Sequence, residues 1–540
     1  MQRNSNLNNR PSQNEMAELE SLFKQNELDK LEKKIGKLIY TYPKIPILYN
    51  ILGVVFQKKN NIDQAILNFK KAIDLKPKFE QALNNLGNVL QSKRNFNEAI
   101  KNYKIAIRNN PNYAEAYSNL GNALAELGRF EEAANNQKHA IKLNPNHAEF
   151  YTNLGSSLVE LGKIEEAIIN HKKAIKINPN YAEAYSNLGN ALADLGEFEE
   201  AVKNHQYSIK LNPKYTRAIL NESFLRLALG EFEVGWEMFE SRLDPQNTTI
   251  PMKRYESEKT WKGNYLDGTL LVWGEQGIGD HIIFGSMISD LKRYAKNIIL
   301  EIDQRLVNLF SRYFEKIDFL NIKVIGMQEK LVSNFDKHIS IGSLGQYLRK
   351  SKKSFESSPE KFLISPHEKE SELKKKFFQN DKFKIGISWK TLNPKQQYRN
   401  INLKEMLPIL SNPKCEFINL QYGKSEEDLK FIEAKFGIKI KTINEVDNYN
   451  DIDGYAALIN CLDLVITIQN STAHIASALG KKTFVTVSRL GTPKWHWHAD
   501  KKKSLWYPSL TIFLQEKIGN WDNVIADINN DLNTLISDIN

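Results

Sequence analysis

A glycine-rich turn joins an apolar run to an amphipathic run in the stretch LLVWGEQGIGDHIIFG, residues 270–285. Its glycines, Gly274, Gly277 and Gly279, allow a backbone to approach a ligand closely, and Asp280 follows where a helix would begin. A carboxylate at such a turn either caps the helix or projects into a cleft toward a substrate. The spacing G-x-x-G-x-G is neither the dinucleotide fingerprint nor a phosphate loop ending in Gly-Lys-Ser/Thr. Kinase and dehydrogenase functions are therefore disfavoured.

Short apolar runs alternate with helical patterns around and beyond this turn. Such alternation is typical of a parallel sheet with crossover helices, whose ligands bind at the carboxyl ends of the strands. A lysine-rich segment at about 351–382 separates two series, so we expect two facing α/β lobes, 269–360 and 361–540. The predicted strands are TLLVW (269–273), NIILEI (297–302), FKIGISW (383–389), EFINLQ (416–421), LVITI (464–468) and TFVTV (483–487).

The N-terminal part carries an internal repeat of 34 residues. The unit NYAEAYSNLGNALAELGRFEEAANNQKHAIKLNP resembles the tetratricopeptide repeat, in which small residues let two helices approach and a proline ends the second helix. We expect an α-solenoid over 12–249, with about six to seven repeats whose ends are degenerate, and a linker at 250–268. The marking residues are Pro43, Pro77, Pro111, Pro145, Pro179 and Pro213, and Gly53, Gly87, Gly121, Gly155 and Gly189.

Asparagine recurs at one position of each first helix of the array. Tetratricopeptide arrays place that helix on their concave side, so the amides would line a groove and bracket an extended peptide. Alternatively, they bond only between adjacent helices. The first alternative predicts a protein partner in the groove, and the residues concerned are Asn85, Asn119, Asn153, Asn187 and Asn221.

From Trp261 onward the chain resembles the heptosyltransferase-like glycosyltransferases (family nine), in the bacterial form with tetratricopeptide repeats in front. The matching pieces, in the expected order, are WKG, LDGTLLVWGEQGIGD, GISWK with RNINL, INLQYG, DLVITIQNSTAHIASALGK, and LWYPSLTIF followed by WDNVI. The resemblance implies a GT-B fold of two Rossmann-like lobes, with the acceptor on the first lobe and the nucleotide-sugar donor on the second.

The resemblance also implies inverting transfer of a sugar from a nucleotide sugar to an acceptor hydroxyl. Gly279-Asp280 matches the Gly-Asp that supplies the catalytic base in heptosyltransferases, so Asp280 would deprotonate the acceptor. The turn residues Gln276, Gly277 and Gly279 are predicted to contact substrate. No cofactor is expected beyond the nucleotide-sugar co-substrate.

The second lobe would hold the diphosphate leaving group. The turn Asn470, Ser471, Thr472 opens a predicted helix, whose N-terminus offers unpaired N–H groups and a positive dipole end. Lys390 and Arg399 are cations that can stabilise the departing phosphate. Three further candidate binding residues are Gln421 and Tyr422, for the base or ribose, and His474, which keeps its family position.

The chain departs from the family pattern on the donor side. Relatives commonly have Asp-Thr where this chain has Gln469-Asn470, and an arginine between two tryptophans where it has His496. A lost carboxylate alters which ribose or sugar hydroxyl is bound, and a lost arginine weakens any phosphate contact it made. The alternative function is therefore a non-catalytic scaffold with a degenerate glycosyltransferase domain.

Two other features mimic sites. The sequence DID at 451–453 resembles the acidic pair of metal-dependent glycosyltransferases, but a helical pattern follows it, which predicts Asp453 as an N-cap and no metal site. The aromatic cluster of Trp495, Trp497, Trp506 and Tyr507 either stacks on a sugar or base or packs in a core.

Composition narrows the class of protein. The net charge of +10 comes from lysines scattered among acids, so we expect solvated faces and no nucleic-acid partner. The expected partners are a nucleotide sugar, a protein or glycan acceptor and a protein in the repeat groove. With 2 cysteines, no secretory signal and no apolar run long enough to span a bilayer, a cytoplasmic enzyme is expected.

Overall fold

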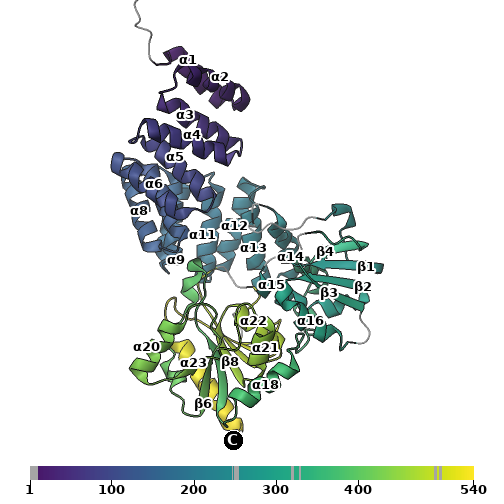
Figure 1. Ribbon diagram of the computed structural model, residues 1–540. Helices are drawn as coiled ribbons and strands as arrows, with labels where there is room; N and C mark the ends of the chain where they lie inside the picture. The colour runs from purple at the N-terminus through teal and green to yellow at the C-terminus, as the bar shows by residue number, and fades with distance from the viewer. Residues whose placement is uncertain are drawn as a thin grey trace, which may run out of the picture. The chain divides into compact units, whose positions relative to one another are not determined.

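The computed structural model describes residues 10–245, 247, 255–275, 277–317, 321–327, 330–491, 495–497 and 502–539 (Figure 1). The chain divides into two compact units, residues 1–184 and 185–540. The boundary between them lies inside the repeat array, whereas the sequence places a domain boundary at 250–268. The last repeats therefore group with the two sheets.

The first unit is a stack of helix pairs, in the order expected of a tetratricopeptide solenoid. The pair before Pro46 is present, as predicted for a degenerate first repeat. The helices are α1 (Gln13–Lys24), α2 (Leu28–Thr41), α3 (Pro46–Lys58), α4 (Ile62–Leu75), α5 (Glu80–Ser92), α6 (Phe96–Asn109), α7 (Ala114–Glu126), α8 (Phe130–Leu143), α9 (Ala148–Glu160) and α10 (Ile164–Ile177), and α11 (Ala182–Leu195) begins at the unit boundary.

The repeating glycines are explained by one buried side chain in each pair. A Cβ on Gly53 would lie 2.6 Å from the ring of Phe69, and one on Gly155 would lie 2.5 Å from the ring of His171. Glycine is therefore required for the close approach of the two helices. The covering side chains form a column at 34-residue steps: Phe69, Tyr103, Gln137 and His171.

The turn inside each pair needs a left-handed residue. Gly128 and Gly162 both have φ of 74°, whereas Arg94 holds the same place at φ of 61°. A side chain in this conformation costs about 1 kcal/mol. We therefore expect Arg94→Gly to raise the unfolding free energy by about that amount, as measured by thermal melting. The reciprocal change Gly128→Arg should lower it, and a lower melting temperature for Arg94→Gly would contradict this account.

In the second unit the last repeat is docked on the first sheet. Its second helix is short, and Phe232, Trp236 and Phe239 are buried in the same core as the sheet residues. Trp236 Nε1 donates a hydrogen bond to the carbonyl of Arg349 at 2.9 Å. The elements here are α12 (Phe198–Leu211), α13 (Thr216–Leu229), α14 (Phe232–Phe239) and the 3-10 turn Glu240–Leu243.

The first sheet has four parallel strands in the order β3-β2-β1-β4. The strand order reverses between β1 and β4, so their carboxyl ends border a crevice. The first strand begins at Leu266, inside the predicted linker. The elements are β1 (Leu266–Trp273), α15 (Ile278–Gly285), β2 (Ala295–Ile302), α16 (Val307–Phe314), β3 (Asn321–Gly326), β4 (Lys337–Ser340) and α17 (Gly345–Leu348), with 3-10 turns at Ser257–Lys259, Ile288–Arg293, Gln304–Leu306, Ile341–Leu344 and Lys352–Phe355.

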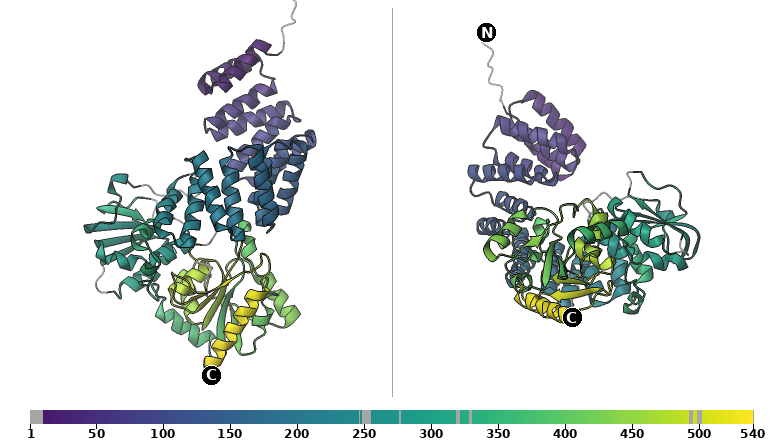
Figure 2. Two further views of the ribbon diagram at one scale, coloured as in Figure 1. Left: turned by 180° about the vertical axis from the view of Figure 1, so that it is seen from behind. Right: turned by 60° about the horizontal axis from the view of Figure 1, so that its bottom comes forward.

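The second sheet has six parallel strands in the order β10-β9-β8-β5-β6-β7. Every residue of β8 and β9 is buried, as expected of parallel strands covered on both faces. The C-terminal helix lies along the sheet (Figure 2). The elements are α18 (His367–Phe377), β5 (Phe383–Ser388), a 3-10 turn (Pro394–Arg399), α19 (Leu407–Leu410), β6 (Cys415–Asn419), α20 (Glu426–Phe436), β7 (Ile440–Lys441), α21 (Ile452–Asn460), β8 (Leu464–Ile468), α22 (Ser471–Ala478), β9 (Thr483–Val487), β10 (Leu510–Leu514) and α23 (Asp522–Ile539).

The second sheet also reverses its strand order, between β5 and β8. Both sheets thus have a crevice at the carboxyl ends of two strands, where ligands of such sheets bind. Among the described residues, no helix combines the length and the apolarity needed to cross a membrane.

Candidate functional site

The two sequence motifs singled out for chemistry meet in the second unit. Asp280 lies in the first turn of α15, after β1, and α22 begins at Ser471, after β8. The helices pack so closely that a Cβ on Gly279 would lie 3.1 Å from Cδ2 of His474. The glycine thus permits this approach and places the segment Gly279–Asp280 against His474, in the first turn of α22.

Asp280 is half-buried and has two properties that bear on its role. Its Oδ2 accepts a hydrogen bond from the Gly277 N–H at 3.2 Å. The N-cap of α15 is Gly277, so Asp280 is not the cap and instead holds the cap residue from the first turn of the helix. Burial raises the pKa of Asp280 to about 6, the charge of Glu275 adds to this rise, and the Gly277 N–H and Arg242 oppose it. A carboxyl group with such a pKa is ionised at neutral pH yet basic enough to accept a proton.

His474 is buried beside this carboxylate and is neutral. Its Nδ1 lies 2.9 Å from the hydroxyl of Tyr507, and its ring stacks on Trp497 with centroids 4.9 Å apart. Burial lowers the pKa of His474 to about 4, so the imidazole carries no charge at neutral pH. Its contacts favour a role in shaping the wall of the site.

Asn470 and Thr472 are engaged inside the second lobe. Asn470 caps α22: its Oδ1 accepts from Thr472 N at 3.0 Å, while its Nδ2 donates to Ser388 Oγ at 2.9 Å. The amide therefore bridges the ends of β8 and β5. Thr472 is buried, and its hydroxyl lies 2.8 Å from that of Tyr455. These two side chains therefore support the turn that opens α22, and their direct contact with substrate stays a prediction.

Gln421 and Lys390 also have partners within the lobe. Gln421 is buried, and its Oε1 accepts from the backbone N–H groups of Trp389 and Lys390 at 3.0 and 2.9 Å. It fixes the turn after β5 and is not free to bind a nucleotide. The ammonium of Lys390 lies 2.5 Å from the carboxylate of Asp428, which neutralises it in the ground state.

Arg399 and Tyr422 converge on the turn that opens α22. Arg399 Nη1 donates to the carbonyl of Gln469 at 3.4 Å. The hydroxyl of Tyr422 is hydrogen-bonded to Ser471; burial raises the pKa of Tyr422, while that hydrogen bond and the charge of Arg399 oppose the rise. A cation, two hydroxyls and a helix N-terminus therefore face the same place, which suits a phosphate.

The acidic pair in DID is divided between two structural roles. Asp451 caps α21, since its side chain accepts from the Gly454 N–H at 2.8 Å. The prediction of Asp453 as the cap is wrong, because the helix already begins at Ile452. Asp453 instead pairs with Arg312 and accepts from Asn308 Nδ2 at 3.0 Å, and both partners lie on α16.

The remaining predicted features are placed as follows. Trp495, Trp497, Trp506 and Tyr507 are all buried, which agrees with packing in a core. Within the described ranges, no group of three or more His, Cys, Asp or Glu side chains is arranged to hold a metal. Metal independence stays a prediction, and activity lost in EDTA and restored by Mn²⁺ would contradict it. Gln276 lies outside the described residues.

The asparagine ladder makes hydrogen bonds between the first helices of adjacent repeats. Asn85 Nδ2 donates to Asn50 Oδ1 at 3.1 Å, and Asn119 Nδ2 donates to Asn84 Oδ1 at 2.9 Å. These bonds support the second alternative drawn from the sequence. All five amides are half-buried and keep some exposed surface; the others are Asn153, bonded to Ser118, Asn221, bonded to Ser186, and Asn187.

Three residues near Asp280 were not singled out for this turn by the sequence. Glu275 is buried at its start, and His281 accepts from the Asp303 N–H at 3.1 Å, which ties the turn to the end of β2. The hydroxyl of Tyr507 is hydrogen-bonded to His474, and the pKa of Tyr507 is raised by burial and by the charge of Asp280. For one of these residues the sequence did offer a signal, because Glu275 is an acidic residue directly after an apolar strand and Gly274.

Family models of the tetratricopeptide repeat match residues 53–93, 84–137, 121–160, 155–196 and 182–215. Tetratricopeptide repeats are therefore present in the N-terminal half, and such repeats are suited to bind proteins. Two solved structures resemble the chain in part.

One is YrrB, described as a TPR protein with an unusual peptide-binding site, which is 24% identical over 34% of this chain and 95% of its own, with a TM-score of 0.29. The other is MamA, 29% identical over 31% of this chain and 97% of its own, with a TM-score of 0.28. Protein FlbA of Caulobacter vibrioides is 28% identical over 319 residues, which are 54% of this chain and 51% of FlbA. The chain thus spans about half the length of this curated relative.

Proposed function

We propose that the chain is a glycosyltransferase with a GT-B fold that transfers a sugar from a nucleotide sugar to an acceptor hydroxyl with inversion. The oxygen of the acceptor hydroxyl attacks the anomeric carbon, and Asp280 takes the proton of that hydroxyl at the same time. The bond from that carbon to the diphosphate breaks, and the diphosphate leaves toward the N-terminal end of α22.

The observation that carries the proposal is the close packing of Gly279, the neighbour of Asp280, on His474 in the first turn of α22. A half-buried carboxyl group with its pKa raised to about 6 stands beside a helix N-terminus where Arg399, Tyr422 and Ser471 converge. The transfer needs a base on one lobe and an anion-binding turn on the facing lobe. The proton leaves the acceptor toward the base, whereas negative charge develops on the diphosphate as it leaves toward the other lobe.

The repeat array would hold the acceptor or a partner protein. Extended concave surfaces of such solenoids bind peptides, and the half-buried amides of Asn85, Asn119 and Asn153 retain exposed surface there. Because their Nδ2 groups bond between helices, their acceptor oxygens are the atoms offered to a peptide.

A panel of nucleoside diphosphates and their sugars tests the proposal. We expect one of them to raise the melting temperature of the chain, because a hundredfold excess over its Kd adds about 3 kcal/mol to the free energy of unfolding. The matching sugar nucleotide should then be turned over with an acceptor. Arg399→Gln should weaken the shift, whereas Arg293→Gln, on the 3-10 turn after α15, should leave it unchanged.

A non-catalytic scaffold is favoured by one specific observation. Gln469 stands where the family that the chain resembles commonly has a carboxylate, and its Oε1 accepts a hydrogen bond from the Ser488 N–H at 3.0 Å, inside the second lobe. A shift with a nucleotide but no turnover of any sugar nucleotide would support this second function. No shift with the whole panel would contradict the proposed transferase.

A further inference from the structure

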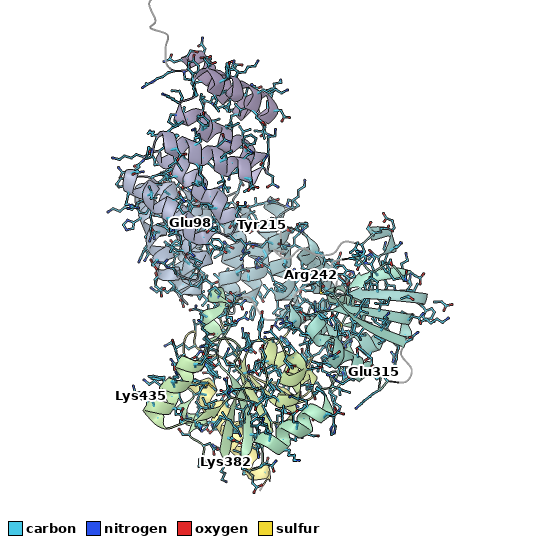
Figure 3. All side chains as sticks on the ribbon, in the orientation of Figure 1. Glu98, Tyr215, Arg242, Glu315, Lys382 and Lys435 are labelled. Atoms are coloured by element: carbon cyan, nitrogen blue, oxygen red, sulfur yellow. The ribbon has the colours of Figure 1, made fainter. Side chains whose placement is uncertain are left out.

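Arg242 lies where the repeat array meets the first sheet (Figure 3). It follows α14 directly, and its side chain is only 1% exposed. The crevice of the first sheet is bordered by the carboxyl ends of β1 and β4, where the strand order reverses. The guanidinium Nη2 donates to Glu275 Oε1 at 2.7 Å, Ser340 Oγ at 2.8 Å and Ser343 Oγ at 2.9 Å, and Nη1 donates to Glu240 Oε1 at 2.7 Å and Phe239 O at 3.1 Å.

Glu275 is the partner that connects this arginine to the candidate site. Its Oε1 also accepts from the Gly342 N–H at 2.9 Å, and a Cβ on Gly342 would lie 2.5 Å from that oxygen. Glu275 is thereby held to the loop after β4 as well as to the array. It begins the same turn that ends in Asp280, whose Oδ2 fixes Gly277.

The buried ion pair of Arg242 and Glu275 contributes little net stability to the attachment of the array to the first lobe. Burying two charges costs several kcal/mol, which their attraction and hydrogen bonds only offset. The array is already attached by apolar contacts with Phe284 of α15. The ring of Trp236 packs edge to face on Phe284, and the ring of Phe239 packs on it at a tilted angle. Attachment alone therefore does not account for the buried pair, whereas a turn that must hold one geometry does.

We propose that Arg242 is a positioning residue of the candidate site, which acts through Glu275 to hold the segment Gly277–Asp280 and thereby makes the last repeat a part of that site. This rests on the proposed function for its consequence in catalysis. The charged or titratable groups that face Asp280 are Glu275 on its own turn, Arg242 from the array, and Tyr507 and His474 from the second lobe.

The two members of the pair act on Asp280 with opposite sign. The charge of Glu275 raises the pKa of Asp280, and that of Arg242 lowers it. Glu275→Gln keeps an acceptor for Gly342 and leaves Arg242 paired with Glu240. It should therefore shift the acidic limb of the kcat/KM profile by about half a pH unit to lower pH, and Arg242→Met should shift it to higher pH.

Loss of position is tested by removing both charges together. The double variant Arg242→Met, Glu275→Gln leaves no buried charge of this pair uncompensated, so it should melt near the wild type. We expect kcat/KM to fall by roughly 10- to 100-fold, since small displacements of a reacting group have effects of this size. The single variant Arg242→Lys, which keeps a positive charge beside Glu275, should have a higher kcat/KM than the double variant. Wild-type kcat/KM and pH profile in the double variant would overturn the proposal.

A measurement without turnover separates this proposal from the proposed function. Asp280→Asn should leave stability unchanged below about pH 3.8 and raise it progressively up to the folded pKa of about 6, above which the gain is constant. In the Glu275→Gln background the gain should level off at lower pH and be smaller. If the wild type transfers no sugar but this shift is seen, the proposed function fails and the action of Glu275 on Asp280 stands. A gain of the same size that levels off at the same pH in both backgrounds would overturn the positioning role.

Discussion

Asp280→Asn is expected to lower kcat/KM by about 10²- to 10⁴-fold, the range for loss of a general base. The amide has nearly the same shape and can still accept from the Gly277 N–H, so the geometry of the turn is kept. In the wild type, kcat/KM should rise with pH through about 6, because Asp280 must be ionised to accept a proton and its pKa lies there.

The same substitution should stabilise the chain at neutral pH. Asp280 has a folded pKa of about 6, raised above the ordinary value of 3.8, so the folded state binds the proton more tightly. The stability that this provides is fully present below 3.8 and is lost as the pH rises through 6. At pH 7.5 the buried carboxylate therefore costs on the order of 2 kcal/mol, which the neutral amide avoids.

Stability and activity are thus expected to change in opposite directions. Thermal unfolding of the transition that includes the sheets, recorded at pH 4 and pH 7.5, should show the gain only at the higher pH. Asp267→Asn is the matched control, because Asp267 lies near the start of the same strand with its side chain 73% exposed. An active Asp280→Asn, or one destabilised at pH 7.5, would remove Asp280 from the proposed role.

The sequence predicts the elements of this fold better than the partners of their side chains. The six predicted strands are all present, because buried parallel strands are continuous apolar runs. The strand β4, KHIS, was missed because it is short and begins with two charged or polar residues. The strand β7, at Ile440–Lys441, has only two residues at the edge of its sheet.

Polar side chains were harder to assign because their partners come from distant segments. Gln421 was expected to bind a nucleotide, but its amide is bonded to the turn after β5 and to the carbonyl of Tyr422. Asp453 was expected to cap its own helix, but Arg312 lies within reach from the other lobe. Asp280 and Gly279 could be placed correctly, since a strand, a glycine turn and a helix are local features.

The largest stability effect outside the site is expected at His171, in the buried column of the first unit. The ring is fully buried under Gly155, and in the described part of the chain neither of its nitrogens has a hydrogen-bond partner. Burial lowers the pKa of His171 to about 4, below the ordinary value of 6.5. The unfolded chain therefore binds a proton between these values that the folded chain does not.

Stability from this group is lost as the pH falls from about 6.5 to 4, by up to roughly 3 kcal/mol. His171→Phe places in the column the residue found at Phe69, removes the titration and leaves no buried nitrogen unpaired. Thermal or urea unfolding of the full chain from pH 4.5 to 7.5 should show a flatter pH dependence for the variant and higher stability at every pH.

Two comparisons make this result specific to burial. His139→Phe changes an exposed histidine on α8 and should leave the pH dependence as in the wild type. His205, buried under Gly189 in the second unit with its pKa also lowered to about 4, should give the same effect in the transition of that unit. If stability depends on pH in the same way for His171→Phe and for the wild type, the ring is protonated in the folded chain. Water or a rearranged neighbouring group would then stabilise its charge.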